Sequence, residues 1–149
     1  MRKPAIPPWD QPCAMRRVDA MQLRHIILKV EDQDRALAFY TQVLGFKKAK
    51  DRRSKLMRWL SVRAPQGATG VELVLEPASF APARKSQKAL YDGGFPAAIL
   101  TTNKIEREYQ RLKELGVKFR TKPRMMGSET CAFFEDTVGN IIVLLQHRR

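Results

Sequence analysis

The sequence has little that would mark a membrane-spanning, secreted or disulfide-linked protein. No apolar run approaches the roughly 20 residues that a membrane-spanning helix needs. The first 20 residues also lack the apolar core, roughly 7 to 15 residues long, of a signal peptide. The chain contains two cysteines, Cys13 and Cys131, which make a poor disulfide framework. We therefore expect a cytoplasmic protein with reduced thiols.

Acidic residues are scarce relative to basic ones, with 15 Asp and Glu against 28 Lys and Arg, a net charge of +13. Such a charge suggests nucleic-acid binding. However, the densest basic run, KKAKDRRSK at residues 47–55, contains no aromatic residue on which bases could stack. We interpret this run as a solvated turn between strands, and nucleic acid is not an expected partner. Residues 1–20, with four prolines, are expected to form an irregular arm.

Residues 22–46, QLRHIILKVEDQDRALAFYTQVLGF, predict a strand, a capped helix and a glycine stop. The period of two in a strand places His25 on the face opposite the apolar one. Asp32 is a favourable N-cap for the helix. Gly45 can adopt the positive φ that ends it.

A similar unit follows, because the Leu-Gly pair at residues 44–45 recurs 71 residues later at residues 115–116. Asn103 and Glu106 have the spacing of a capping box for the second helix. Residues 78–94 are expected to form a linker in which ARKSQKAL favours a short helix. Further strands are expected at residues 56–62, 71–76, 95–100, 117–120, 129–134 and 140–146. The predicted fold is α+β, with two tandem βαβββ modules forming a cupped mixed sheet and the helices outside. Residues 21–149 would form one domain, with modules at 21–77 and 95–146.

Four stretches carry a resemblance to a known family: HIILKVEDQDRALAFYTQVLGF, VELVLEP, the LKELGV helix end and FFEDTVGNIIVLLQ. They resemble the vicinal oxygen chelate superfamily, which includes glyoxalases, bleomycin-resistance proteins and extradiol dioxygenases. The resemblance implies duplicated βαβββ halves. It also implies metal ligands near the start of the first strand and on the fourth strand of each half.

Mapped onto this chain, the first half supplies His25 and Glu72, whereas the second half has Pro96 and Val143 at the corresponding positions. Neither Pro96 nor Val143 can bind a metal ion. A catalytic zinc needs three protein ligands, and non-haem iron needs two histidines and a carboxylate. The only other histidine, His147, lies near the chain end. We therefore expect no cofactor, although a weakly held Zn, Ni, Fe or Mn ion remains an alternative, with Glu76 as a possible third ligand.

The leading hypothesis is a protein that binds a small neutral or anionic organic ligand in the sheet cavity. His25 and Glu72 would be the polar anchors. The other expected ligand-binding residues are Trp59, Ile141, Val143 and Leu145, the last three forming an apolar wall. A purely structural alternative is that His25 and Glu72 only pair with each other. Bleomycin is disfavoured as the ligand because it is cationic and the protein is basic.

A second hypothesis is a lyase or isomerase of glyoxalase type. In that case Glu72, with a pKa raised by apolar surroundings, would act as the general base. The resemblance also implies a homodimer, and nothing in the sequence suggests a membrane partner.

Overall fold

The computed structural model describes residues 21–147, so the predicted arm at residues 1–20 and Cys13 lie outside the described residues. The first module contains β1 (His25–Val30), α1 (Gln33–Ala38), the π-helical turn η2 (Phe39–Val43), β2 (Lys47–Arg53), β3 (Arg58–Arg63) and β4 (Glu72–Pro77). The helix α2 (Ala81–Asp92) follows. The second module contains β5 (Pro96–Thr101), α3 (Ile105–Glu114), β6 (Arg124–Met126), β7 (Glu129–Glu135) and β8 (Ile141–His147).

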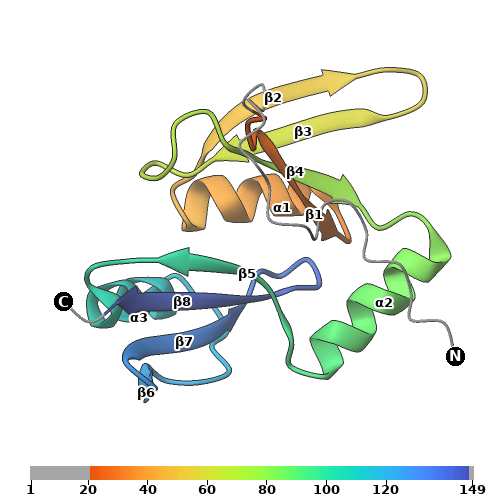
Figure 1. The fold of residues 1–149 in the computed structure, drawn as a ribbon. Coiled ribbons are helices and arrows are strands. Elements are labelled where there is room, and N and C mark those ends of the chain that lie inside the picture. The colour runs from red at the N-terminus through yellow and green to blue at the C-terminus, as the bar shows by residue number, and fades with distance from the viewer. Residues whose placement is uncertain (1–20, 148–149) are drawn as a thin grey trace, which may run out of the picture.

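The strands form two four-stranded sheets, in the orders β1-β4-β3-β2 and β5-β8-β7-β6 (Figure 1). The pairs β1–β4 and β5–β8 are parallel, and the remaining pairs are antiparallel. Each module therefore repeats the same strand order. The predicted α+β fold of two βαβββ modules is confirmed.

One hydrophobic core joins the two modules. In the first sheet it includes Leu28, Val30 and Leu75, and in the second sheet it includes Ile142 and Leu144. The helix α1 lies on the side of the first sheet that faces the second module (Figure 1). Because side chains alternate along a strand, the residues between these core positions point to the other face of each sheet.

The first helix begins as predicted, because the side chain of Asp32 accepts a hydrogen bond from the amide of Arg35 at 2.8 Å. Gly45 follows the helix with φ 77° and Gly116 follows α3 with φ 82°, which confirms both glycine stops. The sequence did not predict the π turn η2. The linker contains a helix, as predicted, and α2 is longer than the predicted stretch, with 12 residues.

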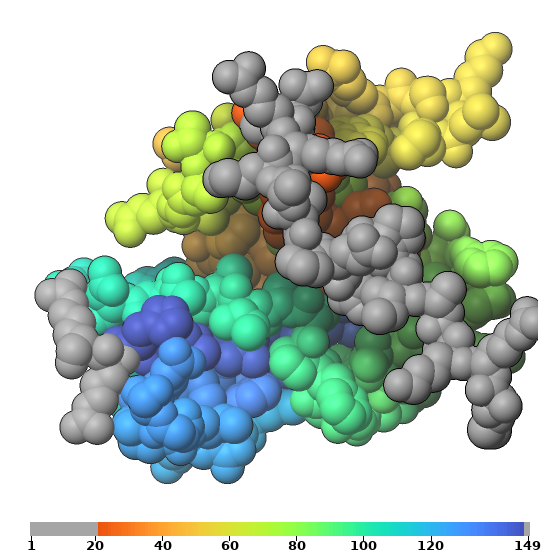
Figure 2. Space-filling view, viewed as in Figure 1, coloured from red at the N-terminus to blue at the C-terminus, as the bar shows by residue number. Residues whose placement is uncertain are grey.

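The basic run at residues 47–55 was predicted as a turn, and this prediction is wrong for most of it. Residues Lys47–Arg53 form β2, the strand at the outer edge of the first sheet. In the space-filling view the hairpin of β2 and β3 projects from the body of the molecule (Figure 2, yellow). Lysine and arginine are tolerated in such an edge strand, where their side chains reach solvent and oppose pairing with another chain.

The predicted capping box at Asn103 is also wrong. The helix α3 has Lys104 as its N-cap, without a side-chain cap bond. Its first amide, that of Ile105, donates instead to the side-chain oxygen of Gln146 at 2.7 Å. In place of a strand at residues 117–120, the structure has a single bridge between Phe119 and Phe134. No helix among residues 21–147 is long and apolar enough to cross a membrane.

Candidate functional site

The first sheet carries a polar cluster on the face opposite the core. In the parallel pair β1–β4, His25 lies opposite Glu72 and Ile27 opposite Val74. In the antiparallel pair β3–β4, Ser61 lies opposite Val74. Residues directly opposite each other point to the same side of a sheet, so this face carries His25, Glu72 and Ser61 together.

Glu72 is the centre of the cluster. Its side chain is only 7% exposed, and its Oε2 accepts a hydrogen bond of 2.7 Å from the hydroxyl of Ser61. Its Oε1 lies 3.4 Å from Nζ of Lys50 and 3.4 Å from Nη2 of Arg63. These groups, first of all the Ser61 hydroxyl, lower the pKa of the Glu72 carboxyl, although burial acts in the opposite direction. Glu72 is therefore a carboxylate near neutral pH.

The lowered pKa corrects one prediction from the sequence. A general base of the glyoxalase type was expected to have a raised pKa because of apolar surroundings. In the structure the surroundings of Glu72 are polar and cationic, so its pKa falls. A carboxylate with a lowered pKa is a weaker base.

His25 is the second predicted anchor. Its Nε2 lies 3.6 Å from Oε2 of Glu72, and its side chain is 37% exposed. Its ring also meets the ring of Trp59 in a T-shaped arrangement, with 5.3 Å between the centroids. The structure thus brings His25, Glu72 and Trp59 together on one face.

The three remaining predicted residues, Ile141, Val143 and Leu145, lie on β8 in the second sheet. They alternate with the core residues Ile142 and Leu144 and so lie on the other face of the sheet, where Ile141 and Val143 are nevertheless buried. Ile141 lines a cavity of about 490 Å³ together with Ile27 and residues of α2. The cavity that Glu72 lines, described next, includes none of these three residues.

Glu72 lines another cavity of about 520 Å³, between the two modules. The first module contributes Arg63 and the loop that precedes β4 to its wall. The second module contributes β5, from Ala97 to Leu100. The neighbour of Glu72 across this cavity is therefore the edge strand β5, and not β8 as expected.

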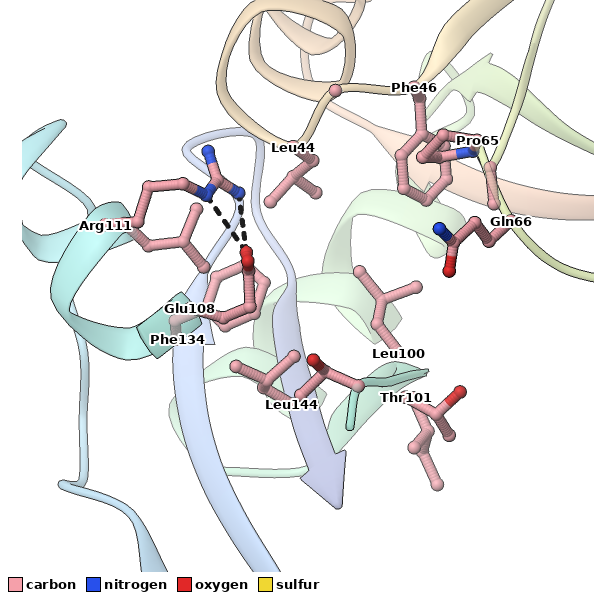
Figure 3. A pocket seen from close by; sticks show the side chains of 15 residues that line it. Leu44, Phe46, Pro65, Gln66, Leu100, Thr101, Glu108, Arg111, Phe134 and Leu144 are labelled. Carbon is pink, nitrogen blue, oxygen red and sulfur yellow. Dashed lines mark hydrogen bonds and ion pairs between the residues drawn. The ribbon is translucent and has the colours of Figure 1, made fainter. Parts of the chain in front are cut away.

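A further cavity of about 520 Å³ lies where α3, β5 and the end of η2 meet (Figure 3). Its lining includes Leu44, Phe134 and Leu144, and Leu144 and Phe134 belong to the common core. Glu108 and Arg111 form an ion pair of 2.9 Å at this cavity. Arg111 also donates to the carbonyl of Val43 at 2.9 Å, on the π-helical turn. Glu72 does not line this cavity, but the cavity adjoins the one that Glu72 lines, with which it shares Phe46, Ala64, Pro65, Ile99 and Leu100.

The chain was compared with known proteins. The family described as Glyoxalase/Bleomycin resistance protein/Dioxygenase superfamily matches residues 22–144. The chain belongs to this superfamily. Among curated relatives, the chain is 44% identical to the uncharacterized protein YurT of Bacillus subtilis (strain 168) over 117 residues, which cover 78% of this chain and 92% of YurT.

Solved structures agree with this membership. UcmS2 is 30% identical, with a TM-score of 0.73, over 85% of this chain and 98% of UcmS2. TnmS3, an antibiotic binding protein from Streptomyces sp. CB03234, is 26% identical, with a TM-score of 0.71, over 88% of this chain and 99% of TnmS3.

Metal centres occur in the superfamily, but the residues that the structure describes do not fit one. Residues 21–147 contain no group of three or more His, Cys, Asp or Glu side chains that could hold a metal ion. Glu76, the third ligand considered from the sequence, forms an ion pair with Lys29 instead. Lys50 and Arg63 also place two positive charges beside Glu72, where they would repel a cation.

His147 does not complete a metal site either. Its Nδ1 lies 2.5 Å from Oε1 of Glu129, the residue opposite it in the pair β7–β8. Sequence reasoning missed Lys50, Ser61 and Arg63 as neighbours of Glu72. The alternation along residues 56–62 does place Ser61 on the side of Trp59, which is the signal that could have found it.

Proposed function

We propose that this protein binds a small neutral or anionic organic molecule at the cluster around Glu72, without a catalytic metal. The observation that carries this proposal is the state of the Glu72 carboxylate. It is buried and engaged by Ser61, Lys50 and Arg63, so its charge is balanced by side chains of the protein. The positive charges of Lys50 and Arg63 oppose a metal ion at this carboxylate, whereas they are compatible with a neutral or anionic ligand.

The surroundings of the cluster support a binding role. Trp59 and Ile27 provide apolar surface next to the polar groups, and Ile27 is 58% exposed. Small-molecule sites combine apolar walls with a few fixed polar groups in this manner. TnmS3, which has the same fold, is an antibiotic binding protein, and this supports the general class. The net charge of +13 disfavours cationic ligands such as bleomycin.

We further propose that the protein acts as a homodimer. The strands β1 and β5 are each at the edge of their sheet, so one side of each backbone has no strand partner among the described residues. Exposed apolar side chains accompany both edges, including Ile26 at 47% and Ile99 at 60%. Pairing β1 of one copy with β5 of another would cover these edges. It would also bring β8 of the second copy near the cluster of the first.

The alternative function is a lyase or isomerase of glyoxalase type, with Glu72 as the base and a weakly held divalent metal. The lowered pKa of Glu72 and the two cations next to it favour the binding role over this alternative. Metal analysis of protein purified without chelators separates the two. A metal content below about a tenth of an equivalent per chain, together with no saturable binding when Zn, Ni, Fe or Mn is added back at about 1 mM, would contradict the enzyme, because even a weakly held catalytic metal must bind at the site.

The binding role itself is tested by thermal shift measurements against a library of small organic molecules. We expect compounds that raise the melting temperature, and we expect His25→Ala and Glu72→Ala to abolish the shift. His147→Ala is the matched control, because it removes the other histidine of the chain, whose ion pair with Glu129 lies outside the cluster. Shifts that survive in both cluster variants would remove the cluster as the binding site.

A further inference from the structure

The positive charges around Glu72 exceed what one carboxylate neutralises. Lys50 and Arg63 both approach its Oε1, and His25 lies beside its Oε2. Arg52 belongs to the same face, because it lies opposite Trp59 in the pair β2–β3. Lys47 also belongs to this face, because it lies opposite Arg63, whereas Lys29 is paired with Glu76. Apart from the pair of Lys29 and Glu76, this face therefore carries four permanent cations, Lys47, Lys50, Arg52 and Arg63, and the single carboxylate of Glu72.

The hydrogen-bonding capacity of these cations is also largely unused. Arg63 makes one contact of 3.4 Å to Glu72, although a guanidinium carries five N–H donors. Lys50 reaches the same oxygen at 3.4 Å and carries three donors. Their side chains are 53% and 37% exposed. Within residues 21–147, Glu72 is the only carboxylate with which either side chain forms an ion pair.

We propose that Lys50 and Arg63 form an oxyanion site beside Glu72, which binds a carboxylate or another oxyanion group of the ligand. This inference rests on the proposed function and specifies the chemical class of its ligand. The guanidinium fork of Arg63 suits two parallel hydrogen bonds to an oxyanion. Oε1 of Glu72 lies 3.4 Å from each cation, and both cationic side chains are partly exposed to solvent.

The ring of Trp59 adds a second element of recognition. Trp59 lies on the same face as Ser61 and Arg63, which follow it on β3. Its ring packs against the ring of His25 in a T-shaped arrangement. An aromatic or otherwise planar acid can lie against this ring while its oxyanion reaches Arg63 and Lys50. The expected ligand is thus a small aromatic acid, with the anionic group at the β2 side of the sheet.

The test uses fluorescence of Trp59 in the full chain, after the other tryptophan is removed by Trp9→Phe. Three probes share one ring and differ in charge: benzoate, benzamide and benzamidine. They are titrated at one fixed ionic strength. We expect benzoate to bind about tenfold or more tightly than benzamide, since a charge-assisted pair contributes more than a neutral hydrogen bond. We expect no saturable binding of benzamidine.

The variants Lys50→Gln and Arg63→Gln test the two cations. Each should weaken benzoate binding by about fivefold or more and leave benzamide binding unchanged. Lys48→Gln is the matched control, because it removes one lysine from the same strand, opposite Val62 and hence on the other face. Circular dichroism confirms that each variant is folded.

Equal affinities for benzoate and benzamide, or no quenching by benzoate, would overturn the oxyanion site. Equal losses of benzoate affinity in Lys48→Gln and Lys50→Gln would also overturn the oxyanion site, because they would indicate a diffuse effect of surface charge. The thermal shift library separates this failure from failure of the proposed function. If neutral compounds still bind in a manner that depends on His25, the binding role remains and only the anion preference is wrong. If no compound binds, both proposals are wrong.

Discussion

The hydroxyl of Ser61 donates a hydrogen bond of 2.7 Å to Oε2 of Glu72, and both residues are buried within the first sheet. The two residues lie on adjacent antiparallel strands, β3 and β4. A hydrogen bond to a carboxylate favours its charged form. This bond is the largest cause of the lowered pKa of Glu72, ahead of the contributions of Lys50 and Arg63. It keeps the centre of the cluster anionic.

We therefore predict that Ser61→Ala raises the pKa of Glu72. Without the hydroxyl, the carboxylate loses the hydrogen bond that most favours its charged form. Burial then favours the protonated form. The measurement is a pH titration of the Glu72 side-chain carboxyl carbon by NMR. Ser128→Ala, in the turn between β6 and β7, is the control and should leave the titration unchanged. An unchanged midpoint in Ser61→Ala would show that the cations alone determine this pKa.

The parts of the fold that the sequence predicted are those with local causes. The alternation in β1, the cap at Asp32 and the glycines at residues 45 and 116 depend on a few neighbouring residues. The wrong predictions have causes distant in sequence. The first amide of α3 is bonded by Gln146, which lies 41 residues away, so no local cap was needed. Helical spacing would place Leu115 on the buried stripe of Ile105, Tyr109 and Leu112, but it lies beyond the end of α3 and is 53% exposed.

The candidate site was predicted only in part, because it also depends on contacts between residues that are distant in sequence. Glu72 and His25 were found from their positions on predicted strands. Lys50 was missed because its segment, residues 47–55, contains six basic residues and one acidic residue. Such a composition favours a solvated turn. It joins the site only because β2 pairs with β3 and a bulge at Ala49 places it opposite Ser61. Strand register of this kind depends on tertiary structure.

A second prediction concerns the hydrogen bond of 3.0 Å between the hydroxyl of Tyr40 and Oδ2 of Asp136. It joins the two modules across 96 residues and is buried. Tyr40→Phe should lower the free energy of unfolding by about 1–3 kcal/mol, because it removes one donor from a buried carboxylate. Urea denaturation measures this difference.

Tyr109→Phe is the matched control for that prediction. Tyr109 is also buried, but its hydroxyl forms no hydrogen bond with another residue in the described part of the chain. Its loss should change the unfolding free energy by about 0.5 kcal/mol or less. Equal effects of the two substitutions would contradict a specific role for the bond to Asp136.

A third prediction concerns nucleic acid. The exposed basic strand β2 and the net charge of +13 should give weak, non-specific attraction to DNA. We expect any complex seen in a gel-shift titration at low salt to disappear at about 0.15–0.2 M salt, because it depends on counterion release. A complex that persists at that salt concentration would indicate that nucleic acid is a partner after all.

The last prediction compares two glycines with similar backbone angles. Gly139 has φ 94°, and a Cβ built on it would lie 2.8 Å from Nε2 of Gln87. Gly45 has φ 77° with nothing within 4 Å of such a Cβ. Gly45→Ala should therefore cost only the strain of the left-handed backbone, about 1–2 kcal/mol. Gly139→Ala should cost about 1–3 kcal/mol more, because the methyl group would also displace Gln87.

The additional cost at Gly139 follows from what Gln87 does. Its Nε2 donates to the carbonyl of Lys29 at 2.9 Å and to that of Val138 at 3.1 Å, so it ties α2 to both modules. Displacing it would remove one of the two donors of each carbonyl and would leave only Asn140 Nδ2 on Lys29 and the Glu31 amide on Val138. Urea denaturation of the two alanine variants provides the comparison. If Gly45→Ala were as destabilising as Gly139→Ala, backbone strain alone would explain both, and Gln87 would not be needed to hold the modules together.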